Sequence, residues 1–225
     1  MNREEYKRQL WKEYVEGHPA IHEVQKEGCL RLGEKFLTGD VSFLYEVHSA
    51  FMEQERFRLG EGLKLEYEKA GEAYILRHEG EEWVFAQREF EEFLERMIGI
   101  FEEVLPLGSV VELKGELLPE IFPPTGVDKV RVVIVQRYVA EDRKEGYYYP
   151  YAGTVYPTGI PGSRKQIAFT PGLIERVVSR GYGDEQEEAY VFLMKRELFL
   201  ERGLHAADFG GKEGGKGEGT DGYPA

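Results

Sequence analysis

The segment LPLGSVVELKG at residues 105–115 marks the point where the chain changes from helical to extended spacing. Before it, apolar residues recur every three or four positions over residues 87–104, opposite a row of glutamates, which predicts an amphipathic helix. Pro106 cannot continue a helix and Gly108 allows the backbone to turn. The segment therefore predicts a helix end followed by a short strand over residues 109–114.

The residues that follow this strand continue the β pattern. VRVVIVQRY at residues 130–138 is apolar on both faces and rich in β-branched residues, which favours a central strand covered on both sides. A tyrosine-rich strand is expected at residues 147–156. The proline-rich stretch at residues 117–126 predicts a loop.

Two further helices are expected near the end of the chain. Thr170 and Pro171 resemble an N-cap and a first helical residue, so we expect a helix that Gly181 closes. Asp184 with Glu187 resembles a capping box and predicts a helix to about residue 202.

The first half mixes both periods. Tyr6, Leu10 and Tyr14 predict a helix, and a second helix is expected from near Pro19 to residue 36. Alternating apolar residues predict strands at 41–47 and 63–67 and a hairpin at 73–85. The fold class is therefore α+β, with antiparallel sheets, packed helices and two lobes. The expected parts are an N-terminal lobe at 1–104, a C-terminal domain at 105–205 and a disordered glycine-rich tail at 210–225.

Composition excludes several classes of function. The 225 residues hold 42 acidic and 29 basic side chains, a formal net charge of -13, which opposes binding to nucleic acid or anionic lipid. Cys29 is the only cysteine, so no internal disulfide or thiolate metal cluster is possible. No signal peptide or membrane-spanning run is found, and we expect a cytoplasmic protein.

No residue pattern indicates catalysis, and we expect no catalytic residue, metal or cofactor. His18 and His22 have a metal-ligand spacing, but Pro19 disturbs the helix turn between them, and a solvated pair is the preferred interpretation. Cys29 lies among apolar residues, where a buried inert thiol is favoured over a nucleophile. A hydrolase stays open only if a deep pocket brings His and Glu side chains together.

Tyrosines are the preferred candidates for contact with a partner protein, because tyrosine offers a large contact area at low entropic cost. Cross-strand aromatic packing explains the same cluster equally well, because an extended strand sends alternate rings inward. The candidate contact residues are Tyr147, Tyr148, Tyr149, Tyr151, Tyr156 and Tyr182.

Several motifs in order carry a resemblance to a known family: LPLGSVVELKG at 105–115, the strand ending at Arg137, YAGTVYPTG at 151–159, and GYGDEQEE at 181–188. Residues 103–200 resemble a small domain family of unknown function from Gram-positive bacteria. Its genes often lie in clusters for type VII secretion and polymorphic toxins. Residues 1–102 carry no such resemblance. The matched signature positions, expected to be mainly structural, are Leu105, Pro106, Gly108, Ser109, Lys114, Gly115, Gly159 and Gly181.

The resemblance implies a setting and no reaction. We therefore expect a non-enzymatic accessory protein, a targeting factor or chaperone-like adaptor, that binds a type VII secretion toxin or a component of the machinery. The alternative is an immunity protein that occludes the active site of a toxin, where the acidic charge would speed association with a basic partner. Oligomeric state and partner identity are not predictable from these residues.

Overall fold

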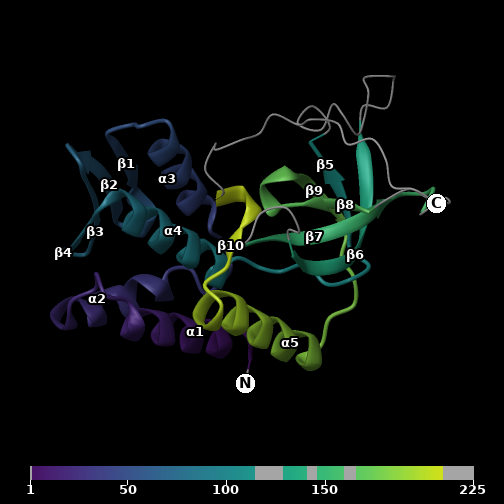
Figure 1. Cartoon of the computed structure of the whole chain (residues 1–225), viewed down its shortest axis with the longest axis horizontal. Coiled ribbons are helices and arrows are strands. Elements are labelled where there is room, and N and C mark those ends of the chain that lie inside the picture. Colours follow the sequence, from purple (N-terminus) through teal and green to yellow (C-terminus); the bar gives the residue numbers. More distant parts are fainter. Residues whose placement is uncertain (1, 115–128, 141–145, 160–165, 210–225) are drawn as a thin grey trace.

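The structure is a computed structural model of the whole chain, and it describes residues 2–114, 129–140, 146–159 and 166–209 (Figure 1). Within these residues, helices pack around a four-stranded sheet in the first half, and a six-stranded sheet forms most of the second half. The α+β fold class with antiparallel sheets is confirmed. No helix in the described ranges is long and apolar enough to cross a membrane.

Three helices open the chain: α1 (Arg3–Gly17), α2 (Glu23–Glu34) and α3 (Ser42–Met52). A capping box begins α1, because the Asn2 side chain accepts from the Glu5 amide and the Glu5 carboxylate accepts from the Asn2 amide, both at 2.9 Å.

The prediction of a strand at residues 41–47 is wrong, because these residues open α3. Phe43, Leu44, Val47, Ala50 and Phe51 are buried, and their spacing of three and four is helical. Of the alternating residues Val41, Phe43, Tyr45 and Val47, only Phe43 and Val47 belong to that stripe. A short apolar segment can fit both periods.

The first sheet is an antiparallel meander of β1 (Phe57–Gly60), β2 (Leu65–Ala70), β3 (Ala73–His78) and β4 (Glu81–Phe85), with the short 3-10 turn Glu61–Leu63 between the first two strands. The predicted hairpin corresponds to β3 and β4, which pair from Tyr74 opposite Phe85 to His78 opposite Glu81. Alternate residues of these strands are buried, as period 2 requires.

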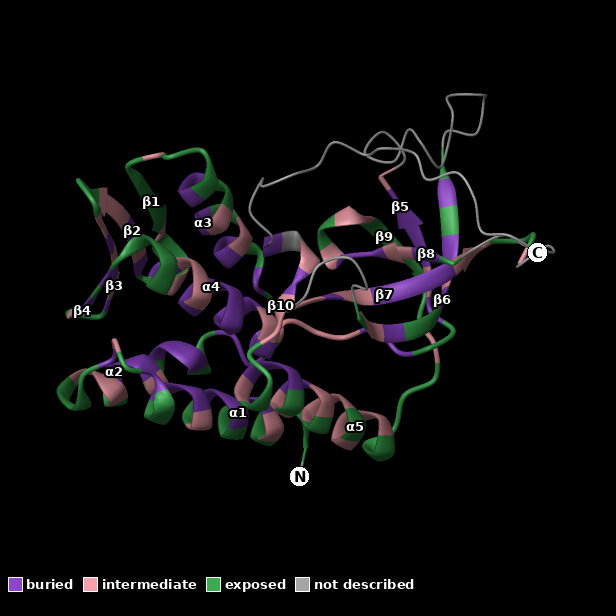
Figure 2. Cartoon of the chain, in the orientation of Figure 1, coloured by how far each residue is buried: buried purple, intermediate pink, exposed green. Residues whose placement is uncertain are grey.

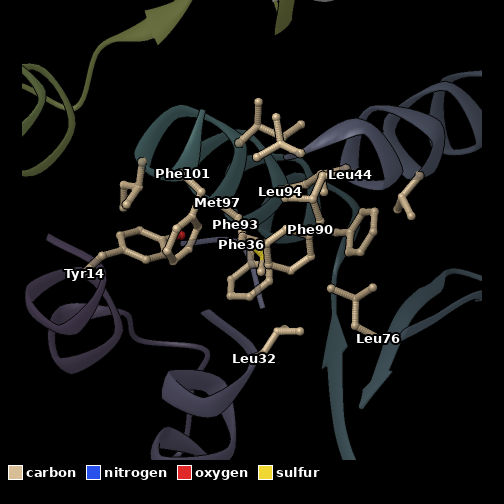
Figure 3. Close-up of a cluster of buried hydrophobic side chains, with 14 of the residues drawn as sticks. Tyr14, Leu32, Phe36, Leu44, Leu76, Phe90, Phe93, Leu94, Met97 and Phe101 are labelled. Carbon is tan, nitrogen blue, oxygen red and sulfur yellow. The ribbon is translucent and has the colours of Figure 1, made fainter. Parts of the chain in front are cut away.

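Helix α4 (Gln87–Phe101) is the centre of the first hydrophobic core. Its apolar stripe is buried as predicted, with Phe90, Phe93, Leu94 and Met97 all fully covered. These side chains meet residues from α1, α2, α3 and β3 in Figure 3. In Figure 2 the buried residues gather around α4, and the exposed ones lie on the outer sides of the helices.

The second sheet has the order β10-β7-β6-β5-β9. The sixth strand, β8, lies off this path and also pairs with β7. Its pairs are antiparallel except the parallel pair of β10 with β7. The strands are β5 (Val110–Leu113), β6 (Val130–Ala140), β7 (Tyr147–Val155), β8 (Ile167–Phe169), β9 (Ile174–Ser179) and β10 (His205–Ala206). One of its faces covers a second, smaller core that includes Val111, Val132 and Phe169.

Two expectations for this sheet are corrected. A 3-10 turn (Pro171–Leu173) follows Thr170, and the residues predicted to be helical then form β9, which pairs with β5. Strand β6 alternates between buried and exposed residues over most of its length, so one face is open to water rather than both being covered. Val177 and Val178 fit either period, and the backbone of β5 decides between them.

The end of the described chain returns to the first core. The N-cap of helix α5 (Glu185–Arg196) is Asp184, as predicted, and its side chain accepts from the amides of Gln186 and Glu187. The Glu187 carboxylate, which was expected to complete a capping box, pairs with Arg137 instead. A π-helical turn (Glu197–Glu201) continues it, and β10 and a final 3-10 turn (Ala207–Phe209) follow. Leu198, Phe199 and Phe209 are all buried in the first core. Residues of the predicted C-terminal domain thus complete the core of the N-terminal lobe.

The loop predicted at residues 117–126 and the tail predicted at residues 210–225 lie outside the described residues.

Candidate binding surfaces and an internal cavity

The six candidate tyrosines do not form one surface. Tyr148 is buried in the first core and Tyr151 in the second, so neither ring can contact a partner. The Tyr151 hydroxyl accepts from the Leu105 amide at 2.9 Å, and its ring lies 5.5 Å from that of Phe169. Burial raises the pKa of both tyrosines. For these two residues, aromatic packing is the correct interpretation.

The other four tyrosines reach the surface to different degrees. Tyr147 and Tyr149 are half-buried, and the ring of Tyr147 lies 5.7 Å from that of His205. Tyr156 is 52% exposed and Tyr182 is 83% exposed. Tyr182 is thus the most accessible of the set.

The signature residues have structural contacts. Gly108 has φ +81°, a conformation that favours glycine. The Ser109 hydroxyl donates to the Pro106 carbonyl at 2.7 Å and accepts from the Gly181 amide at 3.0 Å. A Cβ at Gly181 would lie 2.0 Å from the Leu107 carbonyl oxygen. The segments around Pro106 and Gly181 are therefore locked together by close backbone packing.

The remaining signature residues support the same sheet. Leu105 is buried, and the Lys114 ammonium donates to the Gly172 carbonyl at 2.8 Å. Gly159 has φ +72° and donates to the Val155 carbonyl at 2.8 Å. Gly115 lies outside the described residues.

Helix α5 carries an exposed apolar strip that sequence reasoning found only in part. Tyr190 is 44% exposed and Leu193 is 60% exposed, and their spacing of three places them on one helix face. Tyr182 lies just before the helix. We call Tyr182, Tyr190 and Leu193 the α5 strip. Asp184 and Glu185 are exposed beside it, so the strip has an acidic border.

A buried ion pair fixes α5 on the second sheet. Arg137 on β6 makes two hydrogen bonds with the carboxylate of Glu187, one of them at 3.1 Å. The Arg137 side chain is 4% exposed, and its guanidinium lies 5.1 Å from the centre of the Tyr190 ring. These contacts of Arg137 hold α5, and with it the strip, against the second sheet.

A cavity of about 350 Å³ lies on the other side of α5, between that helix, α1 and the ends of α4 and β9. Apolar side chains form part of its wall, among them Tyr6, Leu10 and Phe192. Tyr6 and Phe192 stack at 4.7 Å, which joins α1 to α5, and the two helices lie side by side in Figure 1. Its volume is at the lower end of the range for ligand pockets.

Two buried lysines line this cavity, and sequence reasoning missed both. The Lys195 ammonium donates to the carbonyls of Ile100 at 3.0 Å and Glu102 at 2.8 Å, and the Lys7 ammonium donates to the Leu37 carbonyl at 3.0 Å. Burial is the main cause that lowers the pKa of Lys195 to about 7 and that of Lys7 to about 8. The signal available in the sequence was the position of Lys195 at the end of the apolar run VFLMK, residues 191–195.

An ionic cluster borders the same cavity. Arg180 donates to both oxygens of Glu103, at 2.9 and 2.8 Å, and Arg3 pairs with Glu103 and, at 3.2 Å, with Glu188. These contacts hold the pKa of Glu103 below its ordinary value despite partial burial. Four segments of the chain meet in this cluster.

The residues considered for metal binding and catalysis lie apart from the cavity. The expectation of a solvated pair is wrong for His18, which is buried among aromatic rings. Burial lowers its pKa, and its Nδ1 accepts from the Ala20 amide at 3.2 Å. His22 is exposed at the start of α2. No group of metal-ligating side chains is found among the described residues. Cys29 is buried, and burial raises the pKa of its thiol.

A histidine and a glutamate do meet at the end of the chain. His205 contacts the buried carboxylate of Glu95, which also accepts from the Ala206 amide at 2.8 Å. The cavity beside Glu95 holds only about 30 Å³, the volume of a single water molecule. The pair therefore anchors β10 on α4 and leaves no room for a substrate.

The fold and these surfaces define an α+β protein with an exposed apolar strip and a cavity between α1 and α5. Residues 104–190 match the model of a family described as a domain of unknown function, DUF4176. The match spans β5 to the first half of α5, so the second half of the chain contains a domain of unknown function. No curated protein and no solved structure matches the chain significantly.

Proposed function

We propose that the protein is a non-enzymatic cytoplasmic accessory protein that binds a partner protein through the α5 strip. The exposure of Tyr182, Tyr190 and Leu193 beside an acidic border carries the proposal. Exposed aromatic and apolar side chains on a supported helix are the usual centre of a protein interface. The partner would be a type VII secretion toxin or a component of that machinery, on the strength of the sequence resemblance.

Co-purification with proteins encoded by neighbouring genes tests this proposal. The wild-type chain should retain at least one of them, and the variant Tyr182→Ser/Leu193→Ser should bind it at least tenfold more weakly. Removal of a buried aromatic anchor costs about 2 kcal/mol or more, which corresponds to roughly thirtyfold in affinity.

Tyr156→Ser is the matched control, because Tyr156 is an exposed tyrosine directly after β7, 52% accessible, and lies outside the strip. It should bind like the wild type. If Tyr156→Ser abolishes binding and the strip variant does not, the contact surface lies at the end of β7 instead. Retention of none of the neighbouring proteins by the wild type would contradict the proposal.

An immunity protein is the second candidate, and the distribution of charge favours it. Residues 1–104 hold 24 acidic and 14 basic side chains, a net charge of -10, and the rest of the chain has only -3. A strongly acidic lobe accelerates association with a basic toxin. Protection of cells that express the toxin would identify an immunity protein, because a targeting factor has no need to neutralise toxicity.

A further inference from the structure

The cavity between α1 and α5 has basic groups in its wall whose hydrogen-bonding capacity is only half used. Lys7 is 5% exposed and Lys195 is 4% exposed. Their ammonium groups have six N–H donors together, and the three hydrogen bonds within the described residues all go to backbone carbonyls. Neither lysine forms an ion pair within the described ranges. The unused donors therefore lack an anionic acceptor.

The cavity wall also contains the carboxylates of Glu102, Glu103, Asp184, Glu187 and Glu188, and the structure gives each of them another partner. Lys195 faces the charges of Lys7, Arg3, Glu102 and Glu103, and Lys7 also faces Glu4. Glu103 is already bound by Arg3 and Arg180. Two neighbouring buried ammonium groups repel each other, and an anion between them would relieve both this repulsion and their desolvation.

The rest of the wall is suited to an apolar group. Tyr6, Leu10, Val191 and Phe192 line the cavity together with Ile100. Its volume of about 350 Å³ corresponds to about ten water molecules at liquid density. An apolar group that displaced this water would gain about 25 cal/mol for each Å² removed from solvent.

We infer that this cavity binds a carboxylate with a short apolar tail, with the carboxylate at Lys7 and Lys195 and the tail against Tyr6 and Phe192. The ligand can be a free small acid or the C-terminal residue of a peptide, because both have the same chemistry. The site lies on the face of α5 opposite the strip, since residues 191, 192 and 195 are about half a turn from residues 190 and 193 as a group. Tyr182, Tyr190 and Leu193 do not line the cavity, although Asp184 beside the strip does.

Proton uptake is the distinctive property of this site. In the empty cavity the pKa of Lys195 is about 7 and that of Lys7 about 8, so part of the amine population is neutral near pH 8. A bound carboxylate stabilises the ammonium forms and raises both pKa values. Binding at pH 8 should therefore take up protons, and affinity should fall as the pH rises from 7 to 9.

Calorimetric titration of the full chain with 3-phenylpropanoate tests the inference, with 3-phenylpropanamide as the neutral analogue. The acid should bind at least tenfold more tightly than the amide. Titrations in phosphate and in Tris at pH 8 should give different heats, because the two buffers supply the absorbed proton at different enthalpies. Equal affinity for acid and amide would overturn the inference.

A second pair of probes distinguishes the two sources of the carboxylate. The peptide acetyl-Gly-Gly-Phe is compared with a free and an amidated C-terminus. Binding of 3-phenylpropanoate and the free-acid peptide alike supports a site open to both sources, and binding of the free-acid peptide alone assigns the site to a peptide terminus. Failure of every free acid contradicts the inference.

Variants of the lysines localise the site. Lys7→Met and Lys195→Met should each weaken binding of the acid at least tenfold, and neither should alter binding of the amide. Lys12→Met is the matched control, because Lys12 lies on α1 with its side chain 63% exposed and pairs with Glu16 at the surface. If Lys195→Met does not fold, Lys7→Met and the acid-to-amide ratio of the wild type still decide the outcome. Unchanged proton uptake in Lys7→Met and Lys195→Met would place the carboxylate elsewhere.

Discussion

The two cores of this protein differ in size and in what surrounds them. Among the described residues, 33 buried apolar residues form the first core and nine form the second. Four buried polar residues lie beside the nine, Ser109, Glu112, Arg137 and Thr170, and six lie beside the 33, Lys7, His18, His78, Glu95, Arg96 and Lys195, so polar groups are a larger share of the second. The first core owes its order to ring packing, and the second depends much more on hydrogen bonds and ion pairs.

The difference follows from how each core is covered. Helices α1 to α4 cover the first sheet, so Phe93 meets rings from α1 and β4 at distances of 4.9 to 6.4 Å. The second sheet covers its core with its own strands, and Phe169 has one ring partner among the described residues, Tyr151. A smaller apolar area gives less stabilisation, and polar contacts then decide the geometry.

Truncation of one ring in each core tests this comparison with the largest expected effect on stability. Phe93→Ala should lower the free energy of unfolding by about 4 to 5 kcal/mol and Phe169→Ala by about 3 kcal/mol, because the cost rises with the volume of the cavity that the missing ring leaves behind. Chemical denaturation of both variants measures the difference. An equal or larger loss in Phe169→Ala would break the comparison.

The buried ion pair of the second half should give the next largest effect. Arg137→Met leaves the Glu187 carboxylate without its partner and should cost about 3 kcal/mol of unfolding free energy. Thermal and denaturant unfolding check this value, and Glu187→Gln in the same chain should recover part of the loss.

A more exposed group of ion pairs in the first half serves as the control. Arg77 pairs with Glu82 at 2.7 Å and with Glu68 at 2.6 Å, and the three side chains are 34%, 49% and 38% exposed. Arg77→Met should cost less than about 1 kcal/mol, because water screens such a pair. If Arg77→Met lowers the free energy of unfolding about as much as Arg137→Met, burial does not determine how much an ion pair contributes to stability here.

The smallest effect concerns the pH dependence of the second sheet. Glu112 is 1% exposed, and Lys129, Arg131 and Arg176 hold its pKa at about 2. A lowered carboxyl pKa stabilises the fold above about pH 4.5, and this contribution is lost as the pH falls through about 2. The three cations are 43 to 56% exposed, so solvent keeps the effect small.

Acid denaturation of Glu112→Gln measures this contribution. The variant should be less stable than the wild type at pH 6, and the two curves should converge as the pH falls from about 4.5 to 2. Glu72→Gln, at an exposed turn, should follow the wild-type curve throughout. A constant difference between Glu112→Gln and the wild type would show that packing, and not charge, is the cause.

The success of each sequence prediction depended on how long its pattern was. Helix α4 has a stripe that continues for four turns, and α5 has a capping residue at Asp184, so both were predicted correctly. Strand β9 and helix α3 were assigned to the wrong class. Their apolar residues fit both periods, and hydrogen bonds to β5, or packing against α4, decide between them.

The tyrosines show a second limit of the sequence. It predicted that a strand would direct some of the rings inward, and Tyr148 and Tyr151 are indeed buried. It could not tell which ones, because Tyr148 and Tyr151 point to opposite faces of β7 and each face is covered by a different core. The exposed Tyr190 was missed because the exposed face of a helix is known only when the elements packed against that helix have been placed.

The sequence by itself determined the α+β class, the acidic charge, the amphipathic α4 and the match of residues 104–190 to a domain of unknown function. These are local or compositional properties, readable within a window of a few turns. Only the tertiary structure decided that α5 returns to lie on α1, and therefore that Lys7 and Lys195 line one cavity although 188 positions separate them. Burial by residues distant in the sequence lowers the pKa values of these two amines, and no local sequence pattern indicates that burial.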